Sequence, residues 1–205
     1  MKKLLLTSSS KFITGAGLNL FERPLNQIKM AYIITASKKI DDLDYITIER
    51  KKFEDGGFDY EEIDIEGKNE DELRKVLKDK ESVYVTSGNA YHLLKCARAS
   101  GFEKIIRELL DKGVIYMGSS AGSYLACPTI EMATWKDSKR DKVNDRCGVT
   151  DFTGMNLVPF LVFAHYTPEY KEIVKGKIQE LDYDIKILND SQAVLVKNEE
   201  VKVIG

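Results

Sequence analysis

A chain of 205 residues can bury one substantial core, so we expect a single domain that spans residues 1–205. Apolar residues make up 43% of the chain and charged residues 31%, with a formal net charge of -2, a balance typical of globular proteins rather than disordered or membrane-spanning ones. Lysine and arginine are scattered among the acidic residues, which disfavours nucleic acid as a partner. The three cysteines are widely separated, which favours neither a disulfide framework nor a zinc knuckle and suits a reducing cytoplasm.

Short apolar runs alternate with segments of helical period over the first part of the chain. The three leucines after Lys2 and Lys3 predict a first strand rather than a signal peptide, because the apolar run ends at once in polar residues. Further strands are expected at 28–35, 60–65, 82–86 and 114–117, and helices at 41–53, 69–80, 90–99 and 102–112. This alternation predicts a doubly wound α/β fold, with a mostly parallel sheet covered by helices on both faces.

The pattern is looser in the second half of the chain. Residues 128–149 carry many charges and no clear period, which predicts a long surface connection. A strand at 161–164, a helix at 168–181, a strand at 185–188 and a C-terminal β-hairpin at 192–197 and 201–204 are expected to follow. No segment approaches the roughly 20 apolar residues of a membrane span, so we expect no membrane partner.

The clearest chemical motif is Gly118-Ser119-Ser120-Ala121-Gly122, a G-x-S-x-G between the strand at 114–117 and a segment that can open a helix. Glycines on both sides let the backbone turn sharply around a raised serine. Free N–H groups at the start of the following helix favour an oxyanion beside it. The motif indicates Ser120 as a nucleophile, and the alternative is a glycine-rich turn in which Ser120 only caps the helix.

A serine hydroxyl needs a base to take its proton, and that base is nearly always histidine. The chain has two histidines. His92 lies inside a predicted helix beside leucines, which favours a structural role. His165 follows the strand at 161–164, and strand ends carry the site residues of open α/β sheets. We therefore expect His165 to be the base, with a half-buried structural histidine as the alternative.

A second oxyanion donor is expected from the loop between the strand at 82–86 and the next helix. Gly88 in this loop offers a free N–H and lets a substrate approach its backbone closely. A simple helix cap by Ser87 or Asn89 is the alternative.

Taken together, these motifs resemble the peptidase E family, also called dipeptidase E or α-aspartyl dipeptidase. The nucleophile segment continues into Ala126-Cys127-Pro128-Thr129-Ile130 as it does in that family. Ser87-Gly88-Asn89 is similar to the family's Gly-Gly-Asn loop, and Leu157-Val158-Pro159-Phe160 with His165-Tyr166 resembles its histidine strand.

The resemblance implies a flavodoxin-like fold akin to class I glutamine amidotransferases. It also implies hydrolysis of short peptides from their amino end, no metal, and often a homodimer. Residue by residue, it implies Ser120 as nucleophile, His165 as base, and the N–H groups of Gly88 and Ala121 as the oxyanion hole.

Several residues are candidates for the acid that orients the histidine. Aspartate-specific members of the family carry an Asp where this chain has Trp135, and Asp137 lies close by but displaced. Related hydrolases such as cyanophycinase take the acid from a turn before the last hairpin, where Asp190 lies. We expect Asp190 to be the acid, then Asp137, then Glu169, and the alternative for Asp190 is a plain turn residue.

The segment after the histidine bears on the substrate. Aspartate-specific members carry an arginine there that can pair with the substrate carboxylate, but residues 167–171 hold none, and Lys171 or Lys175 offers only a point charge. We therefore expect a cytoplasmic serine peptidase with a broader dipeptidase or aminopeptidase specificity, which acts through an acyl-enzyme on Ser120.

Two other classes of function remain open. An α/β esterase or amidase shares the elbow and takes its acid between serine and histidine, for example from Asp137, Asp141 or Asp151. A non-catalytic binding domain on the same fold needs no triad. A glutamine amidotransferase is disfavoured because that class needs cysteine where this chain has Ser120.

Overall fold

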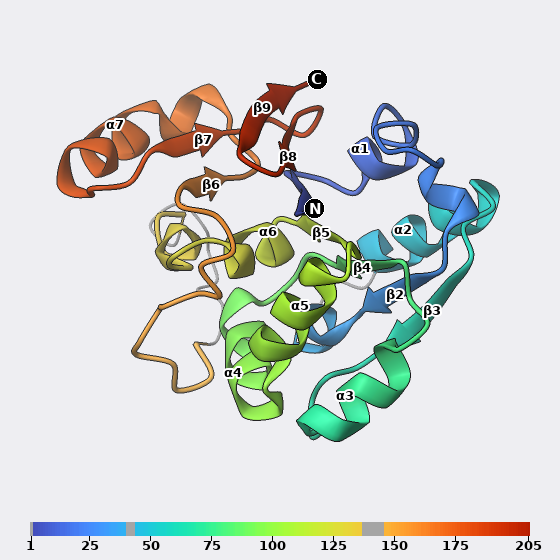
Figure 1. Ribbon diagram of the computed structural model, residues 1–205. Coiled ribbons are helices and arrows are strands. Elements are labelled where there is room, and N and C mark those ends of the chain that lie inside the picture. Colours follow the sequence, from blue (N-terminus) through green and yellow to red (C-terminus); the bar gives the residue numbers. More distant parts are fainter. Residues whose placement is uncertain (1, 40–43, 137–145) are drawn as a thin grey trace.

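The computed structural model describes residues 2–39, 44–136 and 146–205. A seven-stranded sheet forms its centre and contains β1 (Lys3–Thr7), β2 (Met30–Ile33), β3 (Tyr60–Ile63), β4 (Ser82–Val85), β5 (Ile115–Ser119), β8 (Ala193–Lys197) and β9 (Glu200–Ile204). The strands are ordered β3-β2-β4-β5-β1-β8-β9 (Figure 1). The strands β1 to β5 pair in parallel, while β8 runs antiparallel to β1 and β9. The predicted mostly parallel α/β sheet with a C-terminal hairpin is confirmed.

Helices cover both faces of this sheet, and the alternation of side chains along each strand explains why. In β1, Leu4 and Leu6 pack into the core on one face, and Leu5 packs into the core on the other. The first face is covered by α3 (Glu70–Leu77), α4 (Ala90–Ser100), α5 (Phe102–Asp111) and α6 (Ala121–Ala126), and the second by α1 (Lys11–Thr14) and α2 (Asp44–Asp55). Across the described residues, no helix has the length and apolar character needed to cross a membrane.

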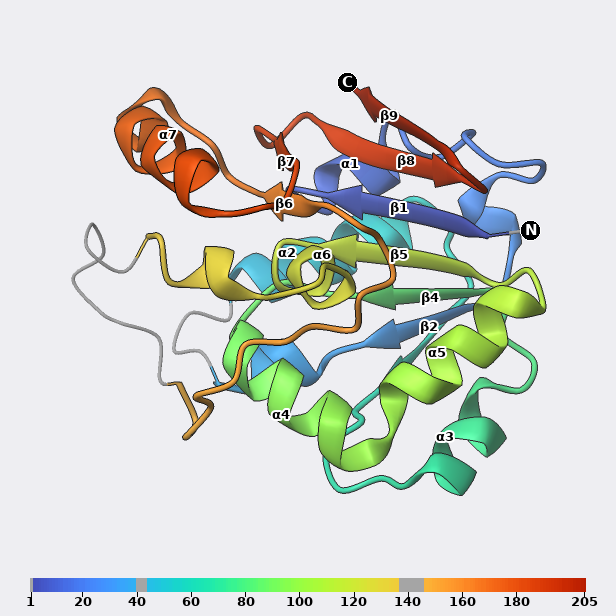
Figure 2. The same cartoon turned by 60° about the vertical axis from the view of Figure 1, so that its left-hand side comes forward.

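A second, smaller sheet is formed by β6 (Leu161–Phe163) and β7 (Ile185–Ile187), which pair in parallel. A 3-10 turn at Pro168–Tyr170 and helix α7 (Lys171–Glu180) connect the two strands. Figure 2 shows this unit beyond the ends of the parallel strands β1, β5 and β4. The sequence predicted these elements correctly, but they form a sheet of their own instead of extending the central one.

Residues 128–149 were predicted to form a surface connection. In the described part of this segment Trp135 and Lys136 are buried, so the prediction was wrong there. Trp135 is 4% exposed and stacks on Phe163 of β6 with 5.6 Å between the ring centroids. Lys136 is 5% exposed, and its Nζ donates to the carbonyl of Ala164 and lies 4.7 Å from the centroid of the Phe163 ring. The many charged residues of this segment suggested exposure, although its aromatic ring and the alkyl part of its lysine pack against β6.

Candidate active site

Ser120 lies at a sharp turn between β5 and α6, half-buried, with φ of 48° and ψ of -102°. Its backbone N–H donates to the carbonyl of Thr7 at the end of β1, which fixes the turn against the sheet. This left-handed backbone is rare for a residue with a side chain and is typical of a strained nucleophile elbow. Among the described residues, Ser120 Oγ has no hydrogen-bond partner, so its hydroxyl is available to a neighbouring base.

Close packing at the elbow requires glycine at position 122. A Cβ atom there would lie 2.1 Å from the carbonyl oxygen of Val85 in β4, well inside van der Waals contact. The first turn of α6 can therefore approach β4 only without a side chain.

We expect Gly122→Ala to lower the free energy of unfolding by about 3 kcal/mol or more, because the clash is with backbone that cannot rotate away. Gly176→Ala is the matched control, since a Cβ at this position in α7 meets nothing within 4 Å and should stabilise the protein by about 0.5–1 kcal/mol. Urea denaturation of both variants measures the difference. Equal stabilities would contradict the close approach of α6 to β4.

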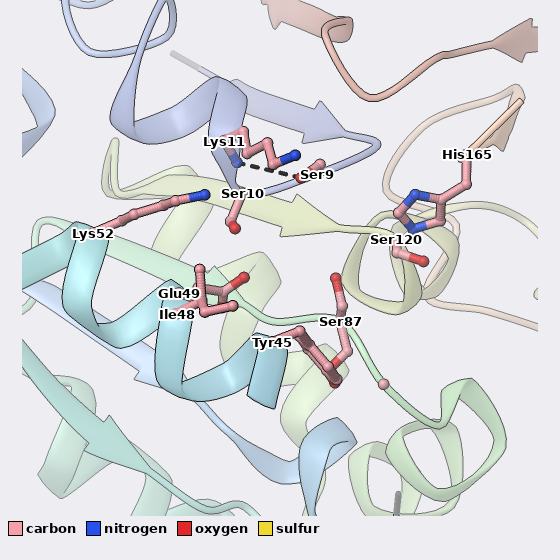
Figure 3. Close-up of a pocket in the computed structure, with 11 residues that line it drawn as sticks. Ser9, Ser10, Lys11, Tyr45, Ile48, Glu49, Lys52, Ser87, Ser120 and His165 are labelled. Atoms are coloured by element: carbon pink, nitrogen blue, oxygen red, sulfur yellow. Dashed lines mark hydrogen bonds between the residues drawn. The ribbon is translucent and has the colours of Figure 1, made fainter. Parts of the chain in front are cut away.

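The carboxyl ends of the parallel strands meet at a cavity of about 500 Å³. Its walls come from the segment after β1, the loop after β4, helix α2, and the predicted nucleophile and base, Ser120 and His165 (Figure 3). The lining residues are Ser9, Ser10, Lys11, Tyr45, Ile48, Glu49, Lys52, Ser87, Gly88, Ser120 and His165. The structure therefore brings Ser120, His165 and Gly88 to one cavity, and Figure 3 shows the His165 ring beside Ser120.

His165 follows β6 in a left-handed backbone conformation, with φ of 54°. Its Nδ1 lies 2.6 Å from Oδ1 of Asp190, and its backbone N–H donates to the hydroxyl of Ser8 at 2.7 Å. The Ser8 hydroxyl in turn donates to the same Asp190 oxygen at 2.8 Å. Because β6 and β7 are parallel, the residues after them lie side by side, and Ser8 ties both to the central sheet.

The hydrogen bond from His165 lowers the pKa of Asp190 to about 2, against the opposing effect of partial burial. Asp190 is therefore a carboxylate at neutral pH and can only accept hydrogen bonds. Nδ1 of His165 must then carry a proton, and in the neutral imidazole Nε2 is the nitrogen that can accept one.

The other predicted acids are placed differently. The carboxylate of Glu169 accepts a hydrogen bond from Thr167 Oγ1 at 2.8 Å, and the residue is exposed. Asp137 lies outside the described residues. Asp190 is thus the predicted acid that the structure brings to His165.

The two predicted oxyanion donors share a second, small cavity with Ser120. This cavity has a volume of about 40 Å³, and Gly88, Ala121, Ser120, His165 and Lys136 are among the residues that line it. Gly88 has φ of 143°, and a Cβ there would lie 2.2 Å from the carbonyl oxygen of Ala36. The loop can therefore take this path only with glycine.

His92 lies in α4 at 3% exposure and is not among the residues that line either cavity. With Glu66 and Cys96 it forms a cluster whose potential ligand atoms all lie within 4.8 Å of one another. Burial raises the pKa of the Cys96 thiol to about 11, so the sulfur keeps its proton at neutral pH and is a weak metal ligand. We assign this cluster no role.

Three residues near the cavities were missed in the sequence. Ser8 directly follows the first strand, and the rule that strand ends carry site residues could have found it. Glu49 and Lys136 gave no such signal, because one lies in an apparently solvent-facing part of a helix and the other in a charged connection.

The sequence model of peptidase family S51 matches residues 4–204 of the chain. The chain belongs to peptidase family S51. This S51 chain is 32% identical over 205 residues to an uncharacterized peptidase of Listeria monocytogenes, covering 98% of this chain and 97% of that protein. It is 28% identical to a peptidase E of Nostoc sp. over 100% of this chain and 86% of that protein.

Solved structures support the same family and fold. A crystal structure from Listeria monocytogenes of a candidate peptidase E superimposes with a TM-score of 0.83 at 29% identity, covering 100% of this chain and 98% of that one. A peptidase from an acI-B1 actinobacterium has a TM-score of 0.69 at 14% identity, covering 100% and 88%, and shows the fold alone. The resemblance to peptidase E is confirmed, and the chain is a peptidase.

Proposed function

We propose that this S51 peptidase is a cytoplasmic serine peptidase that hydrolyses short peptides from their amino end through an acyl-enzyme on Ser120. The observation that carries the proposal is one cavity that holds the strained Ser120 and a histidine whose Nδ1 is bound to a carboxylate. This is the arrangement of a nucleophile, a general base and the acid that orients it. A homodimer stays a prediction.

The chemistry follows from the protonation states. His165 Nε2 takes the proton of Ser120 as the hydroxyl oxygen attacks the peptide carbonyl carbon, and Asp190 stabilises the imidazolium that forms. The N–H groups of Gly88 and Ala121 bind the developing oxyanion in the small cavity. His165 then donates its proton to the leaving amine. Water hydrolyses the acyl-enzyme with His165 again as base.

The larger cavity supports a short substrate. Its volume of about 500 Å³ lies in the range of small-molecule sites and holds a few residues rather than a protein chain. Two lysines and one glutamate line it, so its charges do not select for aspartate alone.

A panel of dipeptides X-Leu, with X as Ala, Leu, Lys and Asp, tests the proposal. We expect hydrolysis of several members, detected by release of free leucine, with Ser120→Ala protein purified in parallel as the control for contaminating peptidases. A p-nitrophenyl ester is included in the same assay. Cleavage of the ester without any dipeptide would indicate an esterase instead, and cleavage of neither would indicate a binding protein.

A further inference from the structure

Glu49 is a buried acidic residue on the wall of the larger cavity. It lies on α2, where the buried positions are Ile46, Glu49 and Phe53, so a carboxyl group occupies a place in the apolar stripe of the helix. Its exposure is only 4%, and none of the described cations lies within 4 Å of it. Buried charges in proteins are ordinarily paired, so a buried carboxylate that lines a cavity indicates a site for a cation.

The hydrogen bonds of Glu49 leave one oxygen for a ligand. Oε1 accepts from Tyr32 Oη at 2.5 Å and from Thr86 Oγ1 at 2.6 Å. Burial and the charge of Glu49 raise the pKa of Tyr32, so its hydroxyl stays a donor. Oε2 has no donor among the described residues. The two donors hold the carboxylate in place, and Figure 3 shows it facing the interior of the cavity, across from Ser120.

The other charges of the cavity lie closer to solvent. Lys11 is exposed and Lys52 is half-buried, so water and salt screen their ammonium groups, whereas the field of Glu49 is screened less. The two lysines suit a substrate carboxylate near the opening, and the interior wall suits a positive charge. Glu49 is therefore the group that can bind a cation in this cavity.

We propose that Oε2 of Glu49 binds a primary ammonium group of the substrate. The inference rests on the proposed peptidase function. The ammonium group comes from one of two sources, the α-amino group of the first residue or the end of a lysine side chain. Both present three N–H donors to the free carboxylate oxygen.

Four substrates of nearly equal shape separate these sources. Lysyl-leucine carries both ammonium groups, norleucyl-leucine only the α-amino group, 6-aminohexanoyl-leucine only the terminal one, and hexanoyl-leucine neither. Each is assayed with wild type, Glu49→Gln and the control Glu54→Gln, which removes the same charge from an exposed position on α2 outside the cavity.

We expect Glu49→Gln to lower kcat/KM about 10- to 100-fold for substrates that carry the bound ammonium group, mainly through KM, and to leave hexanoyl-leucine unchanged. If Glu49→Gln lowers kcat/KM for norleucyl-leucine, the bound group is the α-amino group. If it lowers kcat/KM for 6-aminohexanoyl-leucine, the bound group is the ammonium group at the end of the side chain. Glu54→Gln should match wild type. An equal effect of Glu49→Gln on all four substrates would show a purely structural role and overturn the proposal.

Binding to Ser120→Ala protein with Glu49 intact tests the inference apart from catalysis and from the folding of Glu49 variants. In calorimetric titrations, lysyl-leucine should bind at least about 10-fold more tightly than hexanoyl-leucine. Equal affinities overturn the ammonium site even if the protein is a peptidase. Tighter binding of lysyl-leucine by a protein that cleaves no dipeptide supports the site and rejects the proposed function.

Discussion

Ser120→Ala is expected to lower kcat for dipeptide hydrolysis by about 10⁴-fold or more while the fold stays intact. The loss is large because the covalent route disappears with the hydroxyl, and what remains is the contribution of the oxyanion donors and of binding. Stability should change little, since Ser120 Oγ has no hydrogen-bond partner among the described residues. Initial rates of leucine release and thermal melting measure the two effects.

A double variant that lacks both Ser120 and His165 tests whether the two residues act together. If Ser120 and His165 act as one unit, the double variant with alanine at both positions should be no more than about 3-fold slower than the slower single variant. Diisopropyl fluorophosphate should add one adduct to wild type, located at Ser120 by peptide mass analysis, and none to Ser120→Ala. Residual activity within about 10-fold of wild type in Ser120→Ala would remove this residue from the mechanism.

The inner strands of the central sheet could be predicted because β1, β2, β4 and β5 are buried on both faces and consist largely of apolar residues. The helices could be predicted because the signals at their ends are local. At the start of α3, for example, the Asn69 side chain accepts from the N–H groups of Asp71 and Glu72 and closes a capping box. The placement of β6 and β7 could not be predicted, because a strand of three residues reads the same whichever sheet it joins.

Some residues of the candidate site could also be predicted from the sequence and others could not. Ser120 could be predicted because the turn that exposes it is local, and its glycines are within two residues. Asp190 and Ser8 are 182 positions apart in the chain, so nothing local identifies the acid, and the resemblance to related hydrolases could only rank Asp190 ahead of its alternatives. Glu49 could not be predicted, because a glutamate in a charged helix is expected to be exposed, and its hydrogen bonds with Tyr32 and Thr86 depend on the tertiary fold.

Asp190→Asn is expected to lower kcat about 10²- to 10⁴-fold at neutral pH with a small change in KM. The side-chain amide of asparagine can donate to Nδ1 of His165, which favours the tautomer with the proton on Nε2 and removes the base. It also cannot stabilise the imidazolium as a carboxylate does. Glu169→Gln is the matched control for loss of a nearby acid, and because its carboxylate is bonded to Thr167 we expect less than a 3-fold change, roughly the scatter of a neutral surface substitution.

The pH dependence of Asp190 gives an independent check. With a pKa near 2, the carboxylate stays ionised as the pH falls from 7 to 4, so no loss of activity in that interval comes from Asp190. Because the folded pKa lies below the ordinary value of about 3.9, the carboxylate stabilises the fold above pH 4, and this contribution is lost as the pH falls toward 2. The wild type should therefore exceed Asp190→Asn in stability at pH 5 and lose that advantage by pH 2. The difference should be small, because the side chain is 53% exposed and solvent screens the pair. Full activity of Asp190→Asn, together with inactivity of Asp137→Asn, would transfer the role of the acid to the segment before β6.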